Sequence, residues 1–184
     1  CAIEPDQNGT VVIPSTWSKV DRYAFSYCIK LKYVIIPDNV IVIEGSSFQF
    51  CQNLESVTIP DSVESIGQYA FAYDKNLKSV VIGNNVKSVG KCAFLLCEAL
   101  TSVTFGNSIK YIEAQAFYQA GLKSVVLPST LISLRKSAFS GMPNLERVSI
   151  GENSSSLMVY GNATVSEWAF HRSPKLKTVV LGDC

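Results

Sequence analysis

The chain has few side chains of the kinds that carry out catalysis. Its one histidine, His171, directly follows Phe170, in what we interpret as a surface turn, and an acid–base site needs a second group beside it. The phosphate-binding, nucleophile-elbow and zinc-protease motifs are all absent from the sequence. Asp38 and Asp61 each follow a proline, where an Asx turn explains them. We therefore expect no enzymatic activity, no catalytic residue and no cofactor.

Cysteine is the remaining reactive type, and six cysteines invite a disulfide framework. Three of them, Cys28, Cys51 and Cys97, each stand three residues after a phenylalanine, where Asp74 and Ala120 stand elsewhere. We interpret this as a small buried position, where a free cysteine packs as a modest hydrophobe, and we expect all three thiols to be reduced. A Cys28–Cys51 bridge is the alternative, although parallel side chains give poor geometry for it.

The other cysteines do not predict a site either. Cys92 and Cys97 lack the spacing of zinc ligands, so we expect no metal. Cys1 and Cys184 are expected at opposite ends of an elongated molecule, too far apart to pair within one chain. A chain that starts with cysteine also fits a processed lipoprotein, but we favour an arbitrary boundary as the explanation of Cys1.

Length and charge limit the classes of protein to which the chain can belong. The chain has 184 residues, which suits a single domain over residues 1–184. Lys and Arg number 16 against 15 Asp and Glu, and a net charge of +1 gives no basic surplus for binding nucleic acid. Apolar runs stay well below the roughly 18 residues of a membrane span, so we expect no transmembrane segment.

A repeat organises the whole sequence. Seven phenylalanines lie 23, 23, 23, 23, 22 and 31 residues apart: Phe25, Phe48, Phe71, Phe94, Phe117, Phe139 and Phe170. An aliphatic residue precedes each by five positions, and a leucine follows by six positions or, once, by five. One such unit cannot bury its own apolar side, so the units must stack as a solenoid.

Short β-branched segments separate the units. They end at Pro or Gly, as in Val57–Ile59 and Val80–Ile82, and Val11–Ile13 repeats the ending, which predicts eight strands in one parallel sheet. Three departures from the period are a unit shortened at Gly121, a 31-residue interval before Phe170 with an insertion at about 152–164, and the lack of capping sequences at both ends.

The segment Ile59–Ile82, IPDSVESIGQYAFAYDKNLKSVVI, resembles the 23-residue BspA-like class of leucine-rich repeat, and the resemblance extends from Val11 to Leu181. It implies an α/β repeat: a right-handed leucine-rich-repeat solenoid with a parallel β-sheet on the concave face and short helical turns on the convex face. It also implies a protein-interaction surface, typical of cell-surface or secreted microbial proteins.

Three surfaces could bind a partner. Alternation along each strand exposes one side of the sheet, with the candidate residues Tyr33, Ile35, Ser56, Thr58, Thr104, Arg147 and Ser149. The insertion Ser154–Tyr160 breaks the period and offers Leu157, Met158 and Tyr160. An aromatic stripe through Tyr27, Phe50 and Tyr73 ranks third, because packing between repeats already explains it. The Ser, Thr and Val residues on the exposed side of the sheet are equally well explained by their fit to a β-sheet, without any binding role.

Two functions from different classes follow. The first is a non-catalytic, adhesin-like interaction module on a cell surface or in secreted form, binding a host or extracellular-matrix protein or a surface glycan. The alternative is a structural spacer, or a segment that associates end to end with copies of itself, because Thr10–Ile13 and Thr178–Leu181 look like bare sheet edges.

Overall fold

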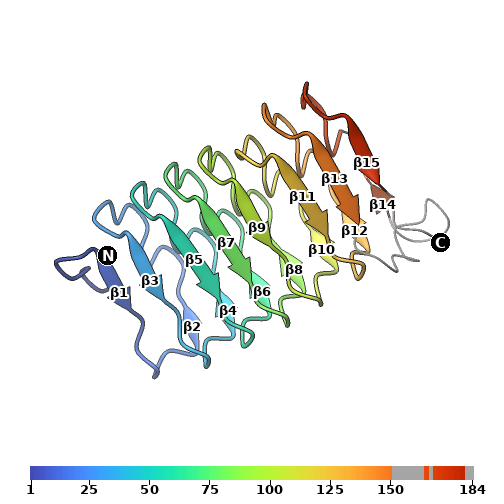
Figure 1. Ribbon diagram of the computed structural model, residues 1–184. Coiled ribbons are helices and arrows are strands. Elements are labelled where there is room, and N and C mark those ends of the chain that lie inside the picture. Colours follow the sequence, from blue (N-terminus) through green and yellow to red (C-terminus); the bar gives the residue numbers. More distant parts are fainter. Residues whose placement is uncertain (151–163, 166–167, 181–184) are drawn as a thin grey trace.

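The computed structural model describes residues 1–150, 164–165 and 168–180, which form a solenoid of stacked coils with parallel sheets (Figure 1). One coil runs from a long strand through a proline or glycine turn into a two-residue strand. It then passes a double turn around the repeat phenylalanine and returns to the next long strand, as between Ser56 and Ile82. The coils repeat about every 23 residues, as the phenylalanine spacing predicts.

The odd-numbered strands are the longer ones, and alternate residues in them face the core because side chains on a strand alternate. In chain order they are β1 (Thr10–Val12), β3 (Tyr33–Ile35), β5 (Ser56–Ile59), β7 (Ser79–Ile82), β9 (Ser102–Thr104), β11 (Ser124–Leu127), β13 (Arg147–Ile150) and β15 (Thr178–Val180). These are the eight predicted strands.

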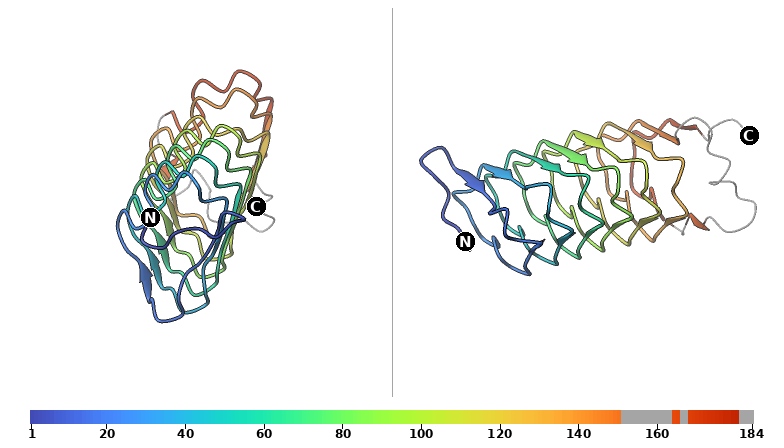
Figure 2. Two further views of the ribbon diagram at one scale, coloured as in Figure 1. Left: turned by 90° about the vertical axis from the view of Figure 1, so that its left-hand side faces the viewer. Right: turned by 90° about the horizontal axis from the view of Figure 1, so that it is seen from below.

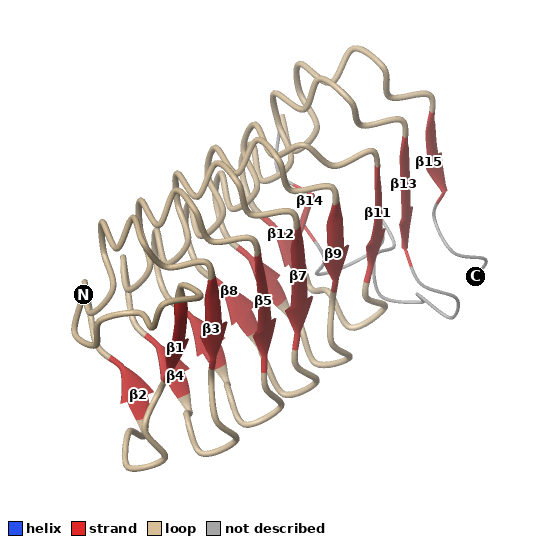
Figure 3. Ribbon diagram, turned by 60° about the vertical axis from the view of Figure 1, so that its left-hand side comes forward, coloured by secondary structure: helices blue, strands red, loops and turns tan. Residues whose placement is uncertain are grey.

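A second parallel sheet, which the sequence did not reveal, forms another side of the coil (Figure 3). Its two-residue strands each end on the aliphatic residue that precedes the phenylalanine by five positions. They are β2 (Lys19–Val20), β4 (Val42–Ile43), β6 (Ser65–Ile66), β8 (Ser88–Val89), β10 (Tyr111–Ile112), β12 (Ser133–Leu134) and β14 (Thr164–Val165). All seven strands are hydrogen-bonded in one continuous sheet.

The expected helical turns are wrong: the described residues contain no helix. Tyr69 and Tyr73, two residues before and after Phe71, have φ angles of 58° and 66°, and a left-handed residue cannot continue a right-handed helix. Backbone N–H groups point along the solenoid instead, so Phe71 N donates to Ala93 O at 2.8 Å and Tyr73 N donates to Leu95 O at 2.8 Å. These bonds between coils offset the strain of the left-handed residues.

The core is a column of stacked rings flanked by aliphatic residues from both sheets. The repeat phenylalanines from Phe25 to Phe139 are fully buried, and neighbouring ring centroids lie 5.0–5.2 Å apart. The column continues to Phe170 at 5.9 Å. This confirms the predicted phenylalanine ladder.

The single eight-stranded sheet is also wrong, because the long strands divide into a five-stranded sheet, β1 to β9, and a three-stranded sheet, β11 to β15. The division falls where the repeat is shortened at Gly121. The residue before a long strand donates to the preceding coil on both sides of this point, as Thr101 N does to Lys78 O at 3.0 Å and Glu146 N does to Lys123 O at 2.8 Å. Lys123 N, in contrast, makes no such bond to Thr101 among the described residues. The shortening therefore interrupts strand pairing only on the long-strand side of the coil, because β8, β10 and β12 remain paired across the same point.

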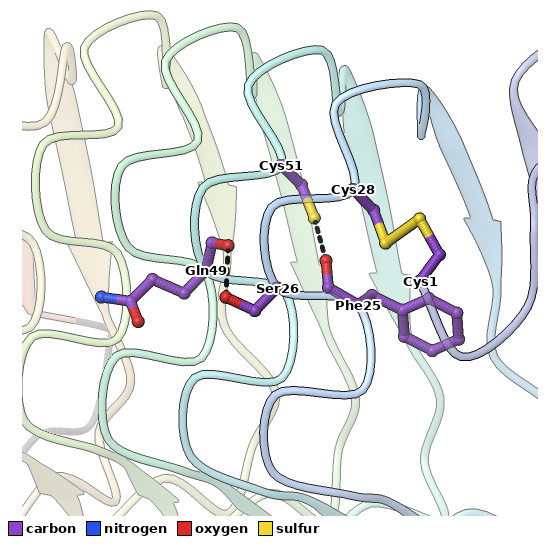
Figure 4. Close-up of a disulfide and its surroundings, with 6 residues drawn as sticks. All are labelled: Cys1, Phe25, Ser26, Cys28, Gln49 and Cys51. Atoms are coloured by element: carbon purple, nitrogen blue, oxygen red, sulfur yellow. Dashed lines mark hydrogen bonds between the residues drawn. A yellow bond between two sulfur atoms is a disulfide. The ribbon is translucent and has the colours of Figure 1, made fainter.

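The N-terminal segment folds back as a partial coil beneath the first repeat (Figure 2). It places Cys1 next to Cys28, with Cα atoms 5.3 Å apart, and the two residues form a disulfide (Figure 4). The expectation of a reduced Cys28 is therefore wrong, because Cys1 lies outside the repeat and its position does not follow from the period. Asp6 accepts from Thr10 N at 2.9 Å, so the expected bare edge at Thr10 is partly capped.

Candidate functional site

The long strands present one exposed side, which we call the strand face. The exposed fraction is 54% for Ile35, 42% for Tyr33 and 61% for Val126. Thr58 and Thr104 are also exposed, as is Arg147, whereas Ser56 and Ser149 are half-buried. These burial states confirm the alternation expected from the sequence, and they leave a row of apolar and hydroxyl side chains in contact with solvent.

Strand register determines which of these residues are neighbours. Thr58 pairs with Val81, and Val81 pairs with Thr104, so these three form one line across β5, β7 and β9. Tyr33 pairs with Ser56. Five strand spacings separate Tyr33 from Arg147, or about 24 Å. Tyr33 and Arg147, the two strand-face candidates of the residue types that most often anchor an interface, therefore belong to separate parts of the face.

A groove of about 620 Å³ opens where the two long-strand sheets separate. Its walls come from β9 and the turn after it on one side, with Thr104 and Phe105, and from β11 and the following turn on the other, with Val126 and Pro128. Phe105 is only half-buried and meets Phe117 edge-on, with centroids 5.7 Å apart. The shortened repeat at Gly121 was the sequence signal for this groove, but its effect on strand pairing was not predicted.

The aromatic stripe forms a stack at one corner of the solenoid. Tyr27 and Phe50, and then Phe50 and Tyr73, stack with ring centroids 4.5 Å apart. Phe50 and Tyr73 are half-buried, so packing between repeats accounts for them, whereas Tyr27 at the end of the stack is 66% exposed. Because the ring faces are turned toward each other, the stripe offers ring edges rather than a flat platform.

The position three residues after each phenylalanine forms a buried column. Cys51 Sγ donates to Phe25 O at 3.0 Å (Figure 4). Cys97 Sγ likewise donates to Phe71 O at 3.1 Å. Both thiols are free and buried, which confirms the prediction for them. Burial, followed by the Asp74 charge, raises the pKa of each thiol above its ordinary range. These cysteines are therefore structural.

Asp74 occupies the same column between Cys51 and Cys97. Its side chain is fully buried, and neither carboxylate oxygen has a hydrogen-bond partner. Burial raises the pKa of Asp74 well above its ordinary value of 3.8, and the nearby backbone of Cys51, whose N–H donates to Phe48 O rather than to the carboxylate, offsets this only in part. The sequence showed that an aspartate stands here but not that it is buried without a partner.

Other expectations concern metals, membranes and the insertion. Within the described residues, no group of three or more His, Cys, Asp or Glu side chains is placed to hold a metal ion. Among the same residues, no helix is long and apolar enough to cross a membrane. His171 is exposed on a turn beside Trp168. The insertion with Leu157, Met158 and Tyr160, and also Cys184, lie outside the described residues.

Solved structures of similar fold come from bacteria. A leucine-rich repeat protein of T. pallidum has a TM-score of 0.74 and 24% identity, over 95% of this chain and 74% of that one. A leucine-rich cell surface protein of Faecalibacterium prausnitzii has a TM-score of 0.63 and 23% identity, over 95% and 60% of the two chains.

A leucine-rich repeat protein of Bacteroides ovatus has a TM-score of 0.59 and 24% identity. The alignment covers 94% of this chain, which spans only 55% of the length of that protein. A comparison with curated protein sequences gives no match. The model of the BspA-type leucine-rich repeat region, six copies long, matches residues 7–120 and again 65–183. The chain therefore belongs to the BspA-type leucine-rich repeat family.

Proposed function

We propose that this chain is a non-catalytic interaction module that binds a partner protein through the strand face. In this proposal the strand face is the concave side of a right-handed solenoid, as the family implies. The observation that carries it is the row of exposed apolar residues on rigid strands, with Ile35 at 54%, Val81 at 43% and Val126 at 61% exposed. A folded chain gains stability by burying such side chains, so an exposed row along one face favours a binding surface.

Two further observations support this surface over the others. Its backbone is fixed by strand pairing, so little conformational entropy is lost when a partner binds. Tyr33 is exposed beside Ile35 and is of the residue type that most often anchors an interface. The groove between β9 and β11 adds a concave region to the same face.

We also propose that the module works outside the cytoplasm, on a cell surface or in secreted form. The Cys1–Cys28 disulfide supports this, because disulfides persist in oxidising compartments and are rare in reducing ones. The cell surface protein of F. prausnitzii shares the fold. Extracellular-matrix or host-surface proteins are then the first partners to test.

The test is a binding measurement against immobilised, purified extracellular-matrix proteins. Tyr33→Ala and Ile35→Ser should each weaken binding by at least about 1 kcal/mol, roughly a five-fold loss of affinity. Tyr27→Ala is the matched control, since Tyr27 is also exposed but lies in the aromatic stripe. Equal binding by both strand-face variants, with loss on deleting Ser154–Tyr160, would place the site in the insertion.

A structural spacer that stacks end to end is the second candidate. The observation in its favour is that, among the described strands, β1 pairs only with β3 and β15 pairs only with β13, so each is an edge strand, although Asp6 caps part of the edge of β1. Light scattering over a concentration series distinguishes the two functions. Reversible growth in mass favours stacking, and a constant monomer mass favours the binding module.

A further inference from the structure

A polar groove of about 500 Å³ lies on the three-stranded sheet, away from the apolar part of the strand face. Its six lining residues are all exposed: Lys123, Ser124, Glu146, Arg147, Lys177 and Thr178. Ser124, Arg147 and Thr178 are register partners on β11, β13 and β15, and the other three residues directly precede them. Three cations and one carboxylate thus share one small surface, which we call the cationic groove.

The repeat supplies an internal comparison in the five-stranded sheet. Lys32, Glu55 and Lys78 occupy the same repeat positions as Lys123, Glu146 and Lys177. There, Lys78 Nζ lies 2.9 Å from Glu55 Oε2, and the hydrogen bond from Lys78 lowers the pKa of Glu55. The fold therefore allows a lysine and a glutamate at these positions to neutralise each other.

The cationic groove lacks this neutralisation. None of its four charged side chains forms an ion pair with any residue that the structure describes. It also carries Arg147 at the position where the first triplet has Ser56. Unpaired cations gathered around an arginine are suited to an oxyanion, because the guanidinium fork holds two oxygen atoms at once.

We propose that the cationic groove binds an acidic sugar, one that carries a sulfate or carboxylate group. Arg147 and the flanking lysines hold the oxyanion, and sugar hydroxyls donate to Glu146. This inference goes beyond the proposed function, because it assigns a ligand of another class to a separate part of the strand face. Lys123 and Lys177 directly precede β11 and β15, which lie two strand spacings apart. The distance between these strands is about 9.6 Å, a span that one or two sugar rings can bridge.

Glu146 favours a sugar over an acidic peptide. A carboxylate among the cations repels a ligand that offers only negative groups, but it accepts hydrogen bonds from hydroxyl donors. The six lining residues also include no apolar side chain, whereas protein hot spots are built around apolar or aromatic anchors.

The experiment is a calorimetric titration of the whole chain at low ionic strength, because salt screens exposed charges. The probes are a sulfated disaccharide, a uronic-acid disaccharide, a neutral disaccharide, sodium sulfate and hexaglutamate. We expect at least one acidic disaccharide to bind more tightly than the neutral one. Arg147→Gln should weaken this binding by about tenfold or more, since it removes a charged hydrogen-bond donor. Lys32→Gln, the matched control beside the five-stranded sheet, should leave it unchanged.

The variant Glu146→Ala distinguishes an acidic sugar from an acidic peptide as the ligand of the cationic groove. For an acidic sugar, this variant weakens disaccharide binding relative to sulfate binding, because the hydroxyl acceptor is gone. If it strengthens the binding of every anionic probe alike and hexaglutamate binds as well as the sugars, the site is for an acidic peptide and the proposal is overturned. Equal binding of acidic and neutral disaccharides, or an unchanged affinity in Arg147→Gln, also overturns it. Either failure leaves the test with Tyr33 and Ile35 intact, so the two ideas fail separately.

Discussion

Replacing Asp74 by cysteine should make the protein more stable at neutral pH. Cysteine already stands at the equivalent position in the coils on both sides, as Cys51 and Cys97, where its thiol donates to a backbone carbonyl. Asp74 is fully buried with both oxygens unpartnered, and leaving one buried polar group unsatisfied costs about 1–3 kcal/mol. For a domain of this size that corresponds to a gain of about 2–12 °C in Tm.

The pH dependence gives a sharper signature than the size of the gain. Burial raises the pKa of Asp74 in the folded chain, whereas the unfolded chain keeps a value near 3.8. Below that pH both forms are protonated, so ionisation adds nothing to the cost of burying the unpartnered carboxyl group. As the pH rises above it, ionisation favours the unfolded chain, and stability falls by up to about 1.4 kcal/mol per pH unit until the folded pKa is reached.

Thermal unfolding followed by circular dichroism at pH 4, 5, 6 and 7 measures this difference. The gain from Asp74→Cys should be largest at pH 7 and should shrink toward pH 4. Cys97→Ala is the control, because Ala120 stands at this position in another coil and no charge changes. A gain independent of pH, or a less stable Asp74→Cys at pH 7, would refute the reasoning.

Three further predictions concern the core and the cysteines. Phe94→Ala opens a cavity in the middle of the ring column and should cost about 3–5 kcal/mol in chemical denaturation, so an unchanged stability would contradict the stacking. Cys1→Ser removes a bridge across 27 residues and should cost about 2–4 kcal/mol, and reductant should then have no further effect on the melting temperature. Cys51 and Cys97 should alkylate slowly in the native protein, because burial raises the pKa of both thiols, and rapid labelling seen by mass spectrometry would contradict their burial.

The repeat made much of the fold predictable. The spacing of residues such as Phe71 and Phe94 fixes which side chains stack, and strand alternation fixes that Thr58 and Thr104 face solvent. The turns were not predictable in the same way, because tyrosine rarely adopts a positive φ and Tyr69 does so only through bonds between coils.

Features outside the period were harder to infer. The position of Cys1 follows from the path of the N-terminal segment, which no repeat unit specifies. The loss of one residue at Gly121 could have interrupted pairing on any side of the coil. Only the structure shows that it interrupts the pairing of the long strands, between β9 and β11. The candidate site was predicted as a face, and the five-coil separation of Tyr33 from Arg147 follows from the repeat itself.

The central claim, that a partner covers the strand face, is tested most directly by chemical footprinting. Single cysteines at Thr58, on the strand face, and at Gln52, on an exposed turn, can be labelled in a chain that also carries Cys184→Ser, because the free thiols among the described residues are buried. With a bound extracellular-matrix protein, labelling of Thr58→Cys should slow several-fold while labelling of Gln52→Cys stays the same. Unchanged labelling of Thr58→Cys in the bound complex would contradict the claim.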